Sequence, residues 1–258
     1  MRIMIFSAIV LVVTAPAAAQ QTLRDEDLSA IAEKVRQFAP RDQFDAPPPQ
    51  QSLAGRRFSY TIEPKPIGRA TNCEAFPEWV YLPAQGRLNF SWSSSLTLTY
   101  NLLGANGPVF PPTMTRPRNA ELTFRSFTCV KRIEPSYTAT NAFGAQFTIE
   151  KMTDVVSAIA DFEPLGARLA PSSWEASVSG DAARTMVANA RVRVSGTLAD
   201  WWPGTSVVCG RKRLEPSIRL PLDRTTDLCL IRGRVERIEV IDQQTGAVLY
   251  SVEPSARR

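Results

Sequence analysis

Apolar and polar residues alternate along much of the chain after about residue 56, and this alternation predicts β-strands. The longest run covers residues 88–102, where the even positions are almost all apolar and the odd positions are Ser, Thr or Asn. Shorter runs cover residues 56–62, 137–149 and 185–198. Successive side chains of a strand point to opposite faces, so each run has one face to bury. The pattern predicts an all-β fold, an antiparallel β-sandwich that forms either one large unit or two small ones.

A slip in the alternation occurs near the C-terminus. Ile231 and Val235 are apolar at odd positions, whereas Ile238 and Val240 are apolar at even positions. One extra residue in the strand, a β-bulge near Glu236, would restore the register. Residues 243–246 then predict a turn into a last strand over residues 247–252.

Helical spacing of apolar residues precedes the strands. Leu28, Ile31 and Val35 fall on one face of a helix, and three acidic residues at positions 25–27 favour its N-terminal end. We therefore expect an amphipathic helix within residues 20–39. Such a helix can dock on its own domain, or it can serve as a recruiting arm that is removable without unfolding the rest.

The remaining chain divides into a linker and a β-rich domain. Residues 40–54 are rich in Pro and Gln, a composition typical of a stiff linker, and residues 55–258 form the β-rich domain. An alternative divides this domain near residues 166–172, because residues 129–136 and 209–217 resemble each other. Residues 154–162 interrupt the alternation with helical spacing, which predicts a short connecting helix.

The N-terminus is typical of an export signal. Arg2 precedes an apolar run over residues 4–13, and three alanines at positions 17–19 fit the small-residue cleavage rule. Residues 1–19 are therefore predicted to be a signal peptide, and the protein to be periplasmic or extracellular. No later stretch approaches 18 apolar residues, so no transmembrane helix is expected.

Export changes the interpretation of the cysteines. Cys73, Cys129, Cys209 and Cys229 form an even set, which in an oxidising compartment predicts two disulfides. Four cysteines allow three pairings, and we favour the two local ones, Cys73–Cys129 and Cys209–Cys229. The chain contains no His and no C-x-x-C pair, so neither a metal site nor a cofactor is predicted.

The absence of His also removes the common hydrolytic mechanisms, including the Ser-His-Asp and Cys-His systems. The remaining hydrolytic route is a pair of carboxylates that flank a cleft, as in glycoside hydrolysis. The candidates lie in strand-rich segments and are Glu78, Glu121, Asp161, Glu175 and Asp200. Most acidic residues are solvated surface groups, so no catalytic residue is assigned.

Two other groups are candidates for surface recognition. Trp201 and Trp202 precede Pro-Gly and could present an indole ring for stacking on a sugar. Arg211, Lys212 and Arg213 are expected in a loop, where they could attract an anionic partner. The net charge is only +5 and acidic residues lie nearby, so a nucleic acid partner is not expected.

These observations favour an exported, non-catalytic binding or interaction module of the cell envelope, with an envelope protein or a glycan as partner. The alternative is a carbohydrate-binding or carbohydrate-active protein that uses an exposed Trp or a carboxylate pair. A second alternative is an outer-membrane β-barrel, suggested by the long alternating runs. The 20 prolines and four cysteines disfavour it. The sequence leaves the oligomeric state open.

Overall fold

The structure, a computed structural model, describes residues 22–37, 51–66, 77–91, 123–161 and 173–253. Strands dominate these residues, which confirms the all-β class. The expected signal peptide, most of the expected linker, and the expected division point near residues 166–172 lie outside the described residues. Within the described part, no helix is both long enough and apolar enough to span a membrane.

The strands form two sheets. The larger one has seven strands in the order β1-β8-β10-β6-β5, with β9 and β11 also paired to β10, and the smaller one has the order β2-β3-β4-β7. The elements are α1 (Asp25–Gln37), β1 (Arg57–Ile62), β2 (Lys65–Pro66), β3 (Glu78–Leu82), η1 (Pro83–Gln85), β4 (Arg87–Ser91), β5 (Thr123–Thr140), β6 (Gln146–Asp161), β7 (Ser173–Ser177), α2 (Gly180–Asn189), β8 (Ala190–Leu198), β9 (Val207–Leu214), β10 (Leu222–Asp242) and β11 (Val248–Val252).

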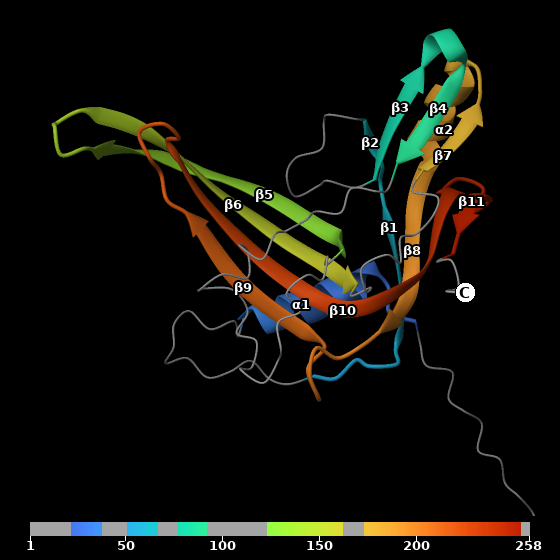
Figure 1. The fold of residues 1–258 in the computed structure, drawn as a ribbon, viewed down its shortest axis with the longest axis horizontal. Helices are drawn as coiled ribbons and strands as arrows, with labels where there is room; N and C mark the ends of the chain where they lie inside the picture. Colours follow the sequence, from blue (N-terminus) through green and yellow to red (C-terminus); the bar gives the residue numbers. More distant parts are fainter. Residues whose placement is uncertain (1–21, 38–50, 67–76, 92–122, 162–172, 254–258) are drawn as a thin grey trace, which may run out of the picture.

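The two halves of strand β10 pair with different neighbouring strands. Its first half, residues 222–232, lies between β6 and β9, and its second half, residues 233–242, lies between β8 and β11. The first half, with β5, β6, β9 and the two hairpin turns, extends to one side of the molecule as a curled sheet that we call the wing (Figure 1). The second half, with β1, β8, β11, α2 and the smaller sheet, is called the body.

The larger sheet is mixed, which corrects the expectation of a purely antiparallel one. β10 runs parallel to β6 from Leu222 to Arg232 and antiparallel to its other partners. The expected helix over residues 154–162 is also wrong, because residues 154–161 form the end of β6. All eight of these residues are buried, and a strand covered on both faces gives a continuous apolar run that periodicity cannot distinguish from a helix.

Two alternating runs are not single strands. In the run over residues 185–198, the first five residues belong to α2, and β8 begins only at Ala190. Ser179 caps α2, since its side chain accepts a hydrogen bond from the Ala182 amide. The run over residues 137–149 is a hairpin whose turn lies between β5 and β6. The bulge near Glu236 is confirmed, because the register between β10 and β8 shifts between Val235 and Arg237.

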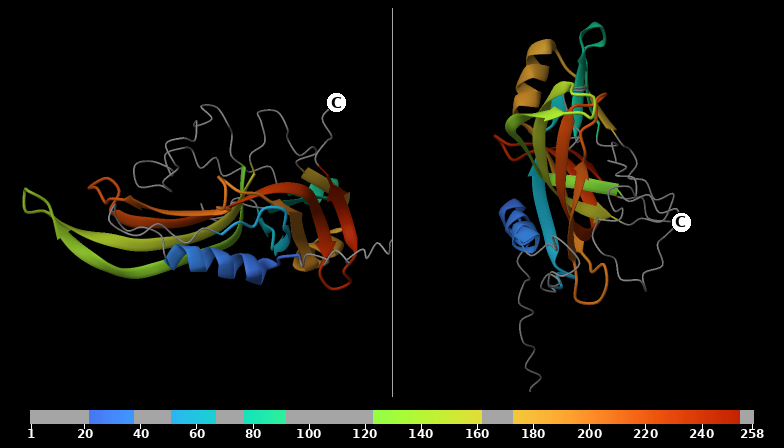
Figure 2. Two further views of the ribbon diagram at one scale, coloured as in Figure 1. Left: turned by 90° about the horizontal axis from the view of Figure 1, so that it is seen from below. Right: turned by 90° about the vertical axis from the view of Figure 1, so that its left-hand side faces the viewer.

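The main core lies in the body and extends under α1. It includes Phe58 and Tyr60 of β1 and Leu88 and Phe90 of β4, so both sheets contribute to one buried cluster. Leu28, Ala32 and Val35 of α1 are buried, and Figure 2 shows α1 lying along the larger sheet. The helix therefore docks on its own domain. Of the two alternatives for this helix, the structure shows the docked one, and removing α1 would expose the sheet that it covers.

Candidate functional site

Exposed apolar side chains gather on the wing. Among the described residues, nine large hydrophobic side chains are exposed, and seven of them lie on the wing. These seven are Val130, Ile133, Tyr137, Phe143, Leu214, Ile218 and Leu220. A concentration of exposed apolar side chains in one region commonly marks an interaction surface. The wing is therefore the candidate functional site.

The first hairpin of the wing presents Phe143 at its turn. The Asn141 side chain accepts hydrogen bonds from the amides of Phe143 and Ala145, at 3.0 and 2.9 Å. Gly144 has a φ of +82°, a left-handed conformation that most residues avoid. The turn is thus fixed by its own sequence, and it holds Phe143 with 94% of its surface exposed.

The second hairpin presents Ile218 at its turn. The amide of Ser217 donates to the Leu220 carbonyl at 2.9 Å, and the amide of Leu220 donates back to the Ser217 carbonyl at 3.1 Å. Ile218 is 64% exposed between them. The amide of Glu150 on β6 donates to the Pro221 carbonyl at 3.0 Å, so the second hairpin is attached to the side of the first.

The register across the wing places further apolar residues on one face. Ile133 of β5 lies opposite Met152 of β6, which lies opposite Arg224 of β10, which in turn lies opposite Leu214 of β9. These four positions form a row across the strands. Its two ends, Ile133 and Leu214, are both exposed, and Ile133 is exposed to 82%.

Ion pairs stiffen the wing between its turns and the core. The Arg213 guanidinium donates two hydrogen bonds to Asp223, at 2.9 and 2.7 Å, and the Tyr137 hydroxyl donates a third at 3.2 Å. The bonds from Arg213 hold the pKa of the Asp223 carboxyl below its usual value. Arg211 pairs in the same way with Asp227 across the strands, at 2.5 and 3.1 Å.

Two more pairs connect β5, β6 and β10. Lys151 on β6 bonds to Glu134 on β5 at 2.6 Å, and the Thr153 hydroxyl donates to the same carboxylate at 2.8 Å. The bond from Lys151 is the main cause that lowers the pKa of Glu134. Arg224 donates to the buried Asp154 at 2.5 Å, which ties β10 to β6. Paired in this way, neighbouring strands of the wing are held together by their side chains as well as by the backbone.

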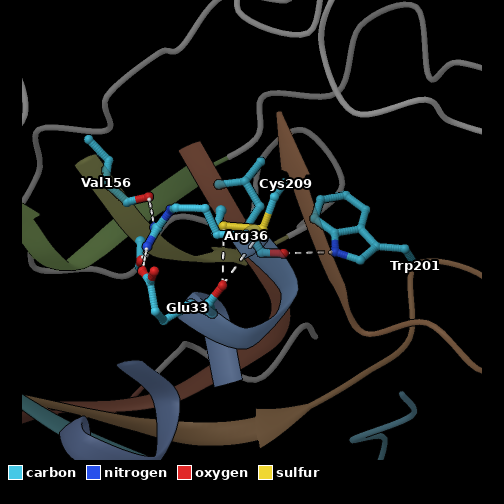
Figure 3. The surroundings of a disulfide bond; sticks show 9 residues. Glu33, Arg36, Val156, Trp201 and Cys209 are labelled. Atoms are coloured by element: carbon cyan, nitrogen blue, oxygen red, sulfur yellow. Dashed lines mark hydrogen bonds and ion pairs between the residues drawn. A yellow bond between two sulfur atoms is a disulfide. The ribbon is translucent and has the colours of Figure 1, made fainter. Parts of the chain in front are cut away.

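A disulfide between Cys209 and Cys229 closes the base of the wing, as predicted. These two residues face each other across β9 and β10. Helix α1 covers the disulfide, with the Ala32 carbonyl oxygen 3.5 Å from the Cys229 sulfur (Figure 3). The other expected disulfide, Cys73–Cys129, involves a residue outside the described part of the chain.

Arg36 anchors α1 to the wing. Its guanidinium donates to the Val156 carbonyl at 3.3 Å and to the Ser157 hydroxyl at 2.8 Å, and it forms an ion pair with Glu33 (Figure 3). Both contacts on the sheet lie on β6. The helix and the disulfide together fix the base of the wing to the core.

The structure places the two predicted Trp residues away from an exposed position. Trp201 is only 3% exposed, and its indole nitrogen donates to the Leu230 carbonyl at 3.3 Å. Trp202 is half-buried against the same cluster, which includes Val208 and Leu228. The exposure that sugar stacking requires is therefore missing at Trp201.

The basic cluster lies in strand β9, which corrects the expectation of a loop. Arg211 and Arg213 point to one face, where Asp227 and Asp223 accept their hydrogen bonds. Lys212 lies between them and opposite Thr226 in the register. Two of the three cations are thus already paired with carboxylates of β10.

The acidic candidates are not brought together as a catalytic pair by their contacts. Asp161 is buried and accepts a bond from the Val235 amide, while Asp200 accepts from the Ser52 hydroxyl and the Gly204 amide. Glu175 pairs with Arg87 on the smaller sheet, where Glu78 lies at the start of β3. Glu121 lies outside the described residues. No group of three or more potential metal ligands occurs in the described segments.

The exposed residues of the two turns were not identified from sequence. The alternation over residues 137–149 predicts a continuous strand with Phe143 on its apolar face. The turn could have been recognised from Asn141 and Gly144, residue types that suit the conformations of hairpin turns. A second indication is the absence of charged residues from Pro135 to Ile149.

Comparison with known proteins gives no assignment. No protein-family model, no curated protein and no solved structure matches the chain.

Proposed function

We propose that this protein is an exported, non-catalytic binding module of the cell envelope and that the wing is its binding surface. One observation carries the proposal: seven of the nine exposed large hydrophobic side chains in the described residues lie on the wing. Apolar surface that the fold leaves exposed in one region is available for a partner to bury.

Export is supported by the sequence and is compatible with the structure. The N-terminal segment has the charged start, apolar stretch and small-residue end of a signal peptide. The Cys209–Cys229 disulfide is compatible with an oxidising compartment. We therefore place the binding module in the periplasm or outside the cell.

The rigidity of the wing favours binding. A surface that is already ordered loses little conformational freedom when a partner binds, which leaves more of the contact energy for affinity. The disulfide, the Arg36 anchor and the bidentate Arg213–Asp223 pair all restrain the wing before any partner arrives.

We also retain the sandwich arrangement as a proposal for the body. Leu88 and Phe90 of the smaller sheet share a buried cluster with Phe58 and Tyr60 of the larger one. Two sheets that bury side chains against one another form the usual core of a sandwich. In this arrangement the body is a support, and the wing projects from it.

Site-specific photo-crosslinking tests the binding surface. The mature chain would carry benzoyl-phenylalanine at Ile133 or Ile218 on the wing, and at Leu82 or Val248 on the body as matched controls. All four side chains are exposed, so none of the replacements disturbs a core. After incubation with envelope fractions, we expect specific adducts from the wing positions only. Adducts that arise equally from Leu82 and Val248 would contradict the proposal.

A glycan is the second candidate partner, because a hollow of about 160 Å³ lies between β3 and α2. Trp79, Tyr81 and Arg184 contribute to its lining, and aromatic rings next to a polar group suit a sugar. Titration with envelope polysaccharides would quench Trp fluorescence in the wild type and not in Trp79→Leu. An unchanged spectrum across these glycans would remove this candidate.

A further inference from the structure

We infer that the wing binds a lipid bilayer, with the Phe143 turn inserted into the interfacial region. The inference deepens the proposed function by naming the partner surface. Charge is unevenly distributed along the first hairpin. Fifteen consecutive residues, Pro135 to Ile149, carry no charge, and charged residues resume at Glu134 on one side and Glu150 on the other. The outer end of this hairpin is therefore free of ionised side chains.

The length of the uncharged end matches interfacial insertion. The chain from Ile149 back to Gln146, where β6 begins, and on to the turn spans about 15 Å. Interfacial segments enter the boundary between headgroups and acyl chains by about 5–10 Å. The turn can reach this depth before any charged side chain leaves water.

Phe143 is suited to be the inserted residue. It is 94% exposed at the outermost turn, and the two bonds to the Asn141 side chain satisfy backbone amides that would otherwise face lipid. Aromatic side chains concentrate at membrane interfaces. A bilayer also accepts a protruding ring without a shaped pocket, which is why we choose lipid over a protein partner.

The second turn provides a weaker contact behind the first. Ile218 lies on a turn that is hydrogen-bonded to β6 at Glu150. Glu150 lies about 13 Å along the strand from the first residue of β6. A tilted wing would bring Ile218 and the neighbouring exposed Arg219 to the headgroups while Phe143 is inserted. The wing would then make an apolar contact at each of its two turns.

Electrostatic attraction contributes little to the affinity of the wing for the bilayer. Lys131, Arg132 and Arg219 are exposed and form no ion pair with the described residues, and the same holds for Glu150 and Glu215. Three cations against two anions give a slight preference for anionic lipid. We therefore expect binding to zwitterionic vesicles and somewhat tighter binding, by less than tenfold, when phosphatidylglycerol is present.

The test uses the mature full chain and vesicles of phosphatidylethanolamine and phosphatidylglycerol. Phe143→Trp places an indole at the turn, and we expect its emission to shift to the blue and to be quenched by lipids brominated on the acyl chain. Val248→Trp is the control on the body and should show neither change. Phe143→Ser should lower the vesicle partition coefficient by about tenfold or more, since burial of a large apolar side chain is lost.

Each outcome decides the inference. Emission from Phe143→Trp that vesicles leave unchanged, or vesicle binding that Phe143→Ser leaves intact, overturns membrane insertion. If vesicles fail but Ile133 still crosslinks to an envelope protein, the proposed function stands with a protein as partner. If both experiments fail, the proposed function fails as well. Because Phe143 is exposed, loss of folding does not confuse the result.

Discussion

β8 in the body buries every second side chain from Ala190 to Leu198, whereas β9 in the wing exposes Arg211, Arg213 and Leu214. Both strands pair with β10, one with each half. The body is therefore stabilised mainly by apolar burial. The outer wing is stabilised by ion pairs and by the disulfide at its base, and it leaves apolar residues to solvent.

This difference indicates a division of roles within one sheet. Apolar burial stabilises the body. Because these apolar residues are already covered, they are not available to bind a partner. Cross-strand pairs in the wing order the strands while the apolar side chains of its turns stay available.

Among the described glycines, the tightest surroundings lie at Gly196, where β8 pairs with β10 beside the bulge. A Cβ atom added at Gly196 would lie 1.9 Å from the Arg234 carbonyl oxygen, so the backbone of one strand must move. We expect Gly196→Ala to lower the free energy of unfolding by about 4 kcal/mol, at the upper end for single substitutions. Urea unfolding followed by circular dichroism measures this loss.

Gly233→Ala is the graded control for that experiment. The nearest atom to its added Cβ is a methyl carbon of the Ile159 side chain at 3.0 Å, and side chains move more easily than backbone. We expect Gly233→Ala to lower the free energy of unfolding by less than Gly196→Ala does. Equal losses of unfolding free energy at Gly196 and Gly233 would show that the close backbone contact at Gly196 does not cause the destabilisation.

Removing the disulfide tests the base of the wing. Cys209 and Cys229 are 20 residues apart, and in the chain-entropy model a loop of this size stabilises by about 3 kcal/mol. The double variant Cys209→Ala/Cys229→Ala should lose about this amount. Amide hydrogen exchange should accelerate more in β9 than in β8. Equal acceleration in the two strands would contradict a separately stabilised wing.

Substitution of Asp223 tests how much the ion pairs stabilise the wing. Asp223 is 2% exposed and accepts three hydrogen bonds, two from Arg213 and one from Tyr137. Asp223→Asn should lower the free energy of unfolding by about 1.5–3 kcal/mol, the range for hydrogen bonds to a charged group. Thermal unfolding at neutral pH measures the difference.

The same pair makes the wing sensitive to acid. The pKa of Asp223 is lower in the folded protein than its ordinary value of 3.8. The ionised form is therefore favoured by folding, and its contribution is complete well above pH 3.8 and is lost as the pH falls below that value. The stability gap between wild type and Asp223→Asn should close over this range. A gap that persists at lower pH would assign the effect to packing.

The sequence predicted well the elements that depend on local pattern. The all-β class, the bulge at Glu236 and the Cys209–Cys229 disulfide follow from alternation, a slip of one residue and cysteine parity. The buried end of β6 was missed because burial on both faces removes alternation. Its parallel pairing with β10 depends on contacts between residues far apart in the chain, which periodicity does not contain.

The candidate site was harder to predict than the fold. Trp201 was selected for its chemistry, but its burial results from packing against strands that precede and follow it. Alternation alone predicts that Phe143 is buried, because apolar residues in an alternating run usually face the core. Its exposure follows from the turn at Asn141 and Gly144, which lies at the outer end of the β5–β6 hairpin.

The smallest expected effect on stability provides the sharpest comparison between the two regions. Phe143 in the wing is 94% exposed, and Phe58 in the body is 1% exposed, so one substitution can be made in both surroundings. Phe143→Ala should change the free energy of unfolding by no more than about 0.5 kcal/mol, as expected for surface positions. Phe58→Ala should cost about 3–5 kcal/mol, because it leaves a cavity in the core. Urea unfolding of both variants measures the two values. If Phe143→Ala also destabilises strongly, the ring has a structural contact within its own chain, and the wing surface is part of the core. If stability is unchanged while vesicle binding falls, the residue serves a partner, which is the role that the contrast between wing and body predicts.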